Sequence, residues 1–300
     1  MLKLLVMLLM SFMGITCTYV SAEAQLATNY KAVPGVTQEE INAIDSLKRS
    51  GRAFSFGSLL TTETFVDKHG NVSGYTVNLC RLLSQLFDIP FVPAVHDWET
   101  LVGGLADKSI DFSGEFTVTP ERRKDYFMSN SISVRSLALF SLGEGKSLKD
   151  IAAVRTPIIG FMKGSANAFQ LAEKYRGPFA AVYAESFPDS LKLLQAGEID
   201  FFISDNVIEP FFEDEKDLTV EIYSPPIYGT MSLATQNVEL EAVISVFDKY
   251  LDNGGQIKLS SQYALGMVDY AKHSLWKNLL MRKEPTLTTV SPRTKKYLLF

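Results

Sequence analysis

The chain has 300 residues and carries 29 Lys and Arg against 34 Asp and Glu, which gives a formal net charge of −5 at pH 7. Charges of both signs are spread along the sequence, without the clusters of basic and aromatic residues that follow a nucleic-acid backbone. Nucleic acid is therefore not an expected partner. The length is sufficient for one large or two medium domains.

Residues 1–24 have the three-part layout of a secretory signal peptide, which predicts an exported protein. Lys3 is followed by an apolar run over residues 4–15, and small residues up to Ala24 fit a cleavage site. The alternative is an uncleaved anchor, but the run is shorter than the roughly 20 residues that span a bilayer. Because Cys17 leaves with the signal, Cys80 is the single expected thiol, and no intrachain disulfide is expected.

The rest of the chain alternates predicted strands and helices. Thr37 with Glu40 is a capping pattern for a short lead-in helix. A strand over residues 53–59, a hairpin around Gly70 and a helix with an apolar face over residues 77–87 follow. Strands are then expected at residues 91–95, 157–161, 180–183 and 199–203, and helices at residues 98–106, 166–174 and 190–195. This order predicts an α/β fold with mostly parallel sheets flanked by helices.

One short pattern occurs twice, about 90 residues apart. Ile110-Asp111-Phe112 and Ile199-Asp200-Phe201 each follow a helix end and a tight turn, and each runs into a polar stop. The repeat predicts two similar lobes. Ligands of open α/β sheets gather at the carboxyl ends of the strands, so the two polar edges are expected to form opposite walls of one cleft.

Five motifs resemble one known family in their order and spacing. They are Gly-Tyr-Thr-Val-Asn-Leu at 74–79, Asp-Trp-Glu-Thr-Leu at 97–101, Thr-Val-Thr-Pro-Glu-Arg at 117–122, Lys-Gly-Ser at 163–165 and Ile-Asp-Phe-Phe-Ile-Ser-Asp at 199–205. Together they resemble the bacterial extracellular solute-binding proteins of family 3, the periplasmic amino-acid-binding type. The resemblance implies a two-lobed, type II periplasmic-binding-protein-like fold in which two crossover strands, near residues 136–142 and 228–234, join the lobes.

The resemblance also divides the chain into segments. Residues 1–24 form the signal peptide and residues 25–51 the lead-in helix. Residues 52–140 form the first part of lobe 1, residues 141–227 form lobe 2, and residues 228–282 return to lobe 1. Residues 283–300 are expected to be a linker or the start of a further module.

The resemblance assigns roles to residues on both walls of the cleft. Arg122 corresponds to the arginine that grips a ligand carboxylate, and Thr117 assists with its hydroxyl and amide. Ser165 after Gly164 opens a helix whose N-terminus attracts an anion, with a plain helix cap as the alternative. Asp205 matches the carboxylate that receives an α-ammonium group.

Further expected ligand contacts come from an aromatic and two acidic residues. Trp98 matches an aromatic that packs on the ligand, with core packing as the alternative. Glu63 ends the segment 60–63, where amino-acid binders often carry an aromatic-Pro-Phe loop. Glu115 replaces a small or hydroxylated residue and is expected to meet a second cationic group or Arg122. Gly57 stands at the position that is acidic in binders of basic amino acids, which makes lysine or arginine a doubtful ligand.

The predicted function is binding of a small amino-acid-like solute by a periplasmic sensor module of a membrane signalling protein. The alternatives are a free component of an amino-acid ABC transporter, with a permease as its partner, or an accessory domain of an enzyme such as a lytic transglycosylase. A further possibility, catalysis by Glu115, Asp205 and Ser165, lacks a supporting nucleophile motif, and His69, His96 and His273 are scattered. No cofactor and no metal site is expected.

Overall fold

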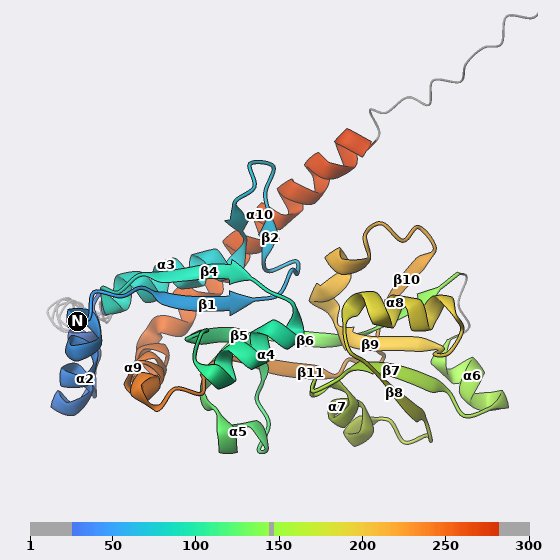
Figure 1. Ribbon diagram of the computed structural model, residues 1–300, viewed down its shortest axis with the longest axis horizontal. Coiled ribbons are helices and arrows are strands. Elements are labelled where there is room, and N and C mark those ends of the chain that lie inside the picture. The colour runs from blue at the N-terminus through green and yellow to red at the C-terminus, as the bar shows by residue number, and fades with distance from the viewer. Residues whose placement is uncertain (1–25, 144–146, 282–300) are drawn as a thin grey trace, which may run out of the picture.

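A computed structural model describes residues 26–143 and 147–281, with α/β architecture throughout (Figure 1). The strands are β1 (Phe54–Ser58), β2 (Phe65–Val66), β3 (Val72–Ser73), β4 (Phe91–Val95), β5 (Phe112–Thr117), β6 (Phe127–Leu142), β7 (Ile158–Met162), β8 (Ala180–Ala184), β9 (Phe201–Asp205), β10 (Leu218–Ile222) and β11 (Tyr228–Thr235). The helices are α2 (Gln38–Arg49), α3 (Tyr75–Phe87), α4 (Trp98–Asp107), α5 (Arg122–Asp125), α6 (Leu148–Val154), α7 (Asn167–Lys174), α8 (Phe187–Gln195), α9 (Glu241–Tyr250) and α10 (Gln256–Met281). Shorter helical turns are η1 (Tyr30–Ala32), η2 (Asn206–Phe212), η3 (Val238–Leu240) and η4 (Leu251–Gly255). The predicted signal peptide and the predicted linker at residues 283–300 lie outside the described residues.

Two parallel groups of strands form the lobes. In the first lobe β1 pairs in parallel with β4 and β5, and in the second β7 pairs in parallel with β8 and β9. The antiparallel strands β11 and β6 lie between the groups, which gives the order β4-β1-β5-β11-β6-β9-β7-β8. Figure 1 shows the two groups side by side, with helices on both faces. The predicted two-lobed α/β class is confirmed.

The long strand β6 passes from one lobe to the other. Residues 127–136 pair with β11, whereas residues 137–140 pair with β9, and β10 pairs with residues 138–142. The change of partner falls between Ser136 and Leu137, so a side chain just before this point lies near both lobes. Arg135 occupies that place.

The apolar core continues across the lobes. One cluster fills the first lobe around Phe54, Leu83 and Phe247, and a smaller one fills the second lobe around Phe161. A third cluster contains residues of both: Leu59, Leu101 and Phe116 from the first lobe, and Phe140, Phe187 and Phe202 from the second. The lobes are therefore packed on each other, because residues of both belong to one buried apolar cluster.

The ends of the described chain return to the first lobe. Helix α2 begins at the predicted Thr37 cap, where the side chains of Thr37 and Glu40 form a reciprocal capping box. Helix α10 packs on α3 and then projects from the body (Figure 1). Within residues 26–143 and 147–281, no helix is both long and apolar enough to cross a membrane.

Candidate functional site

Six of the eight predicted site residues line one small cavity between the lobes. These are Trp98, Glu115, Thr117, Arg122, Ser165 and Asp205, and the remaining lining residues include Arg135, Asn167 and the apolar Leu59, Met162, Phe187 and Ile208. Glu115 and Thr117 belong to β5 and Asp205 ends β9, so the polar residues lie at the carboxyl ends of parallel strands. The repeated strand ends thus meet across one cleft, as the sequence predicts.

Arg122 spans the cleft at the start of α5. Its Nη1 donates to the carbonyl oxygen of Thr117 at 3.1 Å, and its Nη2 donates to the carbonyl oxygen of Gly164 in the second lobe at 3.0 Å. Its guanidinium lies over the rings of Phe116 and Trp98, with centroids 5.0 and 5.9 Å away. Burial lowers the pKa of this guanidinium from its ordinary value. The arginine is held ready to bind an acceptor, and the second lobe supplies that acceptor.

Trp98 makes the neighbouring contact across the cleft. Its indole Nε1 donates to the carbonyl oxygen of Lys163 at 2.8 Å, and its ring lies 5.4 Å from that of Phe116. Asp97 caps α4 through the amide of Thr100, which fixes the helix end that carries the tryptophan. Trp98 is half-buried and serves both as a wall of the cavity and as a link between the lobes.

The position of Ser165 in the second lobe differs from the prediction. Helix α7 begins at Asn167 with Ala166 as its cap residue, so Ser165 lies before the cap and its side chain does not cap the helix. The Ser165 amide is not free for an anion either, because it donates to the carbonyl oxygen of Met162 in a tight turn with Gly164 at φ +75°. The Ser165 hydroxyl itself is buried and has no hydrogen-bond partner within the described residues.

Arg135, which the sequence reasoning missed, joins the acidic residues of both lobes. Its Nη2 lies 2.6 Å from Oε2 of Glu63, and its Nη1 lies 2.8 Å from Oε2 of Glu115 and 3.5 Å from Oδ2 of Asp205. The side chains of Arg135, Glu63 and Glu115 are at most 3% exposed. Glu115 therefore pairs with a cation of the chain itself, Arg135, and not with Arg122.

Burial and pairing act in opposite directions on these charges. Burial alone would lower the pKa of Arg135, but Glu115, Glu63 and Asp205 outweigh it and hold this pKa well above its ordinary value. For Asp205 burial dominates and raises the pKa, although Arg135 and a hydrogen bond from Asn167 oppose it. Arg135 is thus a permanent cation, and Asp205 protonates more readily than an exposed aspartate does.

The cavity between the lobes is closed around its own side chains. Its volume is about 30 Å³, whereas small-molecule sites usually enclose roughly 300–1,000 Å³. One or two water molecules fit such a space. A ligand as large as an amino acid can enter only when the lobes separate and Arg122 and Trp98 release the second lobe.

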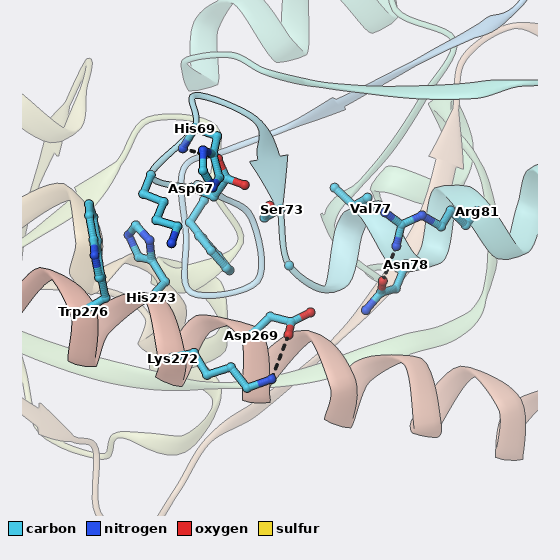
Figure 2. Close-up of a pocket in the computed structure, with 13 residues that line it drawn as sticks. Asp67, His69, Ser73, Val77, Asn78, Arg81, Asp269, Lys272, His273 and Trp276 are labelled. Atoms are coloured by element: carbon cyan, nitrogen blue, oxygen red, sulfur yellow. Dashed lines mark hydrogen bonds and ion pairs between the residues drawn. The ribbon is translucent and has the colours of Figure 1, made fainter.

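A larger cavity, of about 420 Å³, lies on another face of the first lobe. Figure 2 shows it between the β2–β3 hairpin, α3 and α10, with His69 on the hairpin and His273 and Trp276 on α10. Its acidic groups have local partners: Asp67 accepts from the amide of His69, and Asp269 pairs with Lys272. None of the eight predicted site residues lines it. Over the described ranges, no group of three His, Cys, Asp or Glu side chains is placed to hold a metal ion.

The family resemblance now has independent support. Residues 61–175 match the family of bacterial extracellular solute-binding proteins, family 3. This range includes Arg122, Arg135 and most of the cavity wall, and the resemblance predicted from the motifs is confirmed.

Solved structures of amino-acid-binding proteins share the fold at low sequence identity. A mutant of ArgBP from T. maritima is 20% identical with a TM-score of 0.57, over 77% of this chain and 99% of that chain. The amino acid ABC transporter substrate-binding protein AbpA from Streptococcus pneumoniae, bound to L-arginine, is 17% identical with a TM-score of 0.58, over 77% and 98%. The arginine-, lysine-, histidine-binding protein ArtJ from Geobacillus stearothermophilus is 20% identical with a TM-score of 0.55, over 72% and 95%. These similarities establish the type II periplasmic-binding-protein fold.

Proposed function

We propose that the protein binds a small amino-acid-like solute between its lobes, as the exported sensor module of a membrane signalling protein. The observation that carries the proposal is the meeting of Arg122 from one lobe with Asp205 from the other at one cavity. A guanidinium and a carboxylate on opposite walls match the two charged groups of an amino acid. The named structural relatives bind amino acids through the same fold.

Ligand binding is coupled to a lobe movement in this proposal. In the closed state Arg122 Nη2 donates to Gly164 O, and a ligand carboxylate would replace that carbonyl as the acceptor. The ligand then bridges the lobes, and it shifts the balance between open and closed states because it contacts both walls in the closed state alone.

The wall residues do not support catalysis. The Ser165 hydroxyl has no base within hydrogen-bonding distance among the described residues, so it is not activated as a nucleophile. Glu115 is tied to Ser58, Leu59 and Arg135 rather than directed at a reacting group. These contacts favour a receptor.

Thermal unfolding with a panel of amino acids, polyamines and small carboxylates tests the binding function. A true ligand at 100 times its Kd stabilises the folded state by roughly 2.7 kcal/mol, which is a clear rise in Tm. X-ray scattering at saturation then reports whether the lobes change their separation. A panel without any saturable rise in Tm would refute binding of this solute class.

Helix α10 offers a surface for a partner, and the identity of that partner distinguishes the sensor role from the transport alternative. It projects from the body (Figure 1), and the side chains of Leu265, Val268, Leu275 and Leu279 on it are 50–65% exposed. A photo-crosslinking residue at Leu275 in intact cells tests this role, with the exposed Val154 on α6 as the control position. An adduct with a membrane signalling protein supports the sensor, and an adduct with a permease supports the transporter.

A further inference from the structure

Arg135 occupies the position in the cleft that the cationic group of a ligand would take. It reaches the cavity from β6, and its guanidinium meets Glu63 and Glu115 of the first lobe and Asp205 of the second. A guanidinium has five N–H donors in a planar fork, which suits it to several carboxylates at once. The three acids and the arginine form one buried network.

The acids are positioned independently of Arg135. The second oxygen of Glu63 accepts from the Tyr263 hydroxyl at 3.0 Å. The second oxygen of Glu115 accepts from the Ser58 hydroxyl at 2.7 Å and the Leu59 amide at 3.2 Å. Asp205 accepts from the Asn167 side chain at 3.0 Å. Each acid keeps its other oxygen directed at one point, so the surrounding protein is a preformed guanidinium site.

Because Arg135 fills this site, it changes which ligands the cleft can bind. A cationic ligand side chain finds Glu63 and Glu115 already paired with Arg135 at 2.6 and 2.8 Å, and displacing Arg135 would leave a buried arginine without counter-charges. Two polar atoms of cavity-lining residues are buried without a partner among the described residues: Nε of Arg135 and Oγ of Ser165. Both can donate a hydrogen bond, as Arg122 does. The cavity thus offers two unpaired donors besides Arg122, which suit the oxygen atoms of a ligand carboxylate.

We propose that Arg135 is an internal cation that sets the ligand selectivity of the cleft. It excludes amino acids with cationic side chains and favours small carboxylates whose side chain is neutral or anionic. This inference rests on the proposed cleft-binding function for its ligand class. The structural part of the inference, that Arg135 fills a guanidinium site, can be tested without knowing the natural ligand.

The test is chemical rescue of Arg135→Ala by methylguanidinium. The substitution leaves space and unpaired carboxylates, so we expect a lower Tm and a saturable rise of about 5 °C when millimolar methylguanidinium refills the site. Methylammonium, which lacks the planar fork, is expected to bind at least tenfold more weakly. The control is Arg155→Ala, because Arg155 also pairs with an aspartate, Asp200, but lies outside the cavity. Neither the control nor the wild type should respond.

A milder variant covers the case in which Arg135→Ala does not fold. Arg135→Ala with Glu63→Gln removes one unpaired carboxylate and leaves Glu115 and Asp205 to bind the probe. The inference is overturned if a folded variant shows no saturable response, if Arg155→Ala responds equally, or if neither Arg135 variant folds even with methylguanidinium present.

The wild-type ligand panel separates this inference from the proposed function. L-Arginine is expected to bind Arg135→Ala at least tenfold more tightly than the wild type. If the wild type binds no solute but the rescue succeeds, the binding function fails and the guanidinium site stands. If the wild type binds L-arginine as tightly as a small neutral amino acid, the selectivity role of Arg135 is wrong.

Discussion

The indole Nε1 of Trp98 and the carbonyl oxygen of Lys163 form a 2.8 Å hydrogen bond that joins the two lobes directly. Two further bonds cross the same cleft, from Arg122 Nη2 to Gly164 O and from the Thr62 amide to Val207 O. All three hydrogen bonds join the two lobes directly, without a ligand between them. The closed form therefore has its own stabilising contacts, which a ligand must supplement or replace.

Trp98→Phe should shift the ligand-free protein toward an open form. Phenylalanine keeps the ring contact with Phe116 but removes the donor, which is worth about 0.5–1.5 kcal/mol. X-ray scattering should show a larger radius of gyration for this variant. Tyr75→Phe is the matched control, because it also removes a donor to a backbone carbonyl oxygen, that of Ile132, but within the first lobe. Equal radii for Trp98→Phe and wild type would show that this bond does not hold the lobes together.

Arg122→Ala and Asp205→Ala should weaken binding of an amino acid by roughly 2–5 kcal/mol each, because each removes a charge-assisted contact in a partly desolvated cleft. Calorimetry with truncated ligands separates the two roles. An amine without a carboxylate should be nearly indifferent to Arg122→Ala, and a carboxylic acid without an amine nearly indifferent to Asp205→Ala.

The control for these variants is Arg123→Ala. Arg123 is adjacent in sequence but donates to the carbonyl oxygen of Met128 and does not line the cavity. If Arg122→Ala remained folded and bound an amino acid as tightly as Arg123→Ala does, the carboxylate role of Arg122 would be wrong.

The positions of Arg122, Thr117 and Asp205 at the cleft could be predicted because strand ends and their polar stops are local features of sequence. Arg135 could not be found in this way, because its partners are 20, 70 and 72 residues distant in the chain. One signal was present: a single arginine within the mostly apolar and hydroxylated run from Ile132 to Leu142 requires a buried counter-charge. Glu63 and Glu115 were the candidates for that charge.

The Ile-Asp-Phe repeat predicted two lobes, and its aspartates show why the pattern recurs. Asp111 accepts from the amide of Ser55 and pairs with Arg52, while Asp200 accepts from the amide of Ile158 and pairs with Arg155. Each aspartate ties the start of its strand to that of the neighbouring parallel strand. The closure of the lobes, in contrast, depends on contacts between distant segments that no local pattern encodes.

The turns before these aspartates give a paired test. Lys108 and Gly197 each stand three residues before the aspartate, with φ of +67° and +68°. This left-handed conformation costs a residue with a side chain roughly 1–2 kcal/mol. Lys108→Gly should therefore raise the free energy of unfolding by about 0.5–1 kcal/mol, and Gly197→Ala should lower it by about 1 kcal/mol.

Urea unfolding at pH 7 measures both changes. A methyl group at Gly197 would meet no atom within 4 Å, so backbone strain is isolated from steric overlap. The control is Gly103→Ala in α4, where a methyl group also meets no atom within 4 Å and helix propensity favours alanine. Loss of stability in Lys108→Gly would show that the lysine side chain contributes more than its backbone strain costs.

Glu40 should make stability depend on pH at the junction of α2 and α9. Burial would raise its pKa, but hydrogen bonds from Lys249, Ser245 and the Thr37 amide outweigh burial and lower the pKa to about 2. Because the folded pKa lies below the unfolded value of about 4.3, the stabilisation is fully present above that value and is lost as the pH falls toward 2.

Glu40→Gln should thus cost about 2 kcal/mol at pH 7 and progressively less between pH 4.5 and pH 2. Urea unfolding across this range measures the difference, with Glu121→Gln as the control, because the Glu121–Lys124 pair is exposed and solvent screens it. A difference between wild type and Glu40→Gln that stayed constant from pH 7 to pH 3 would show that the charge of Glu40 is not what stabilises this junction.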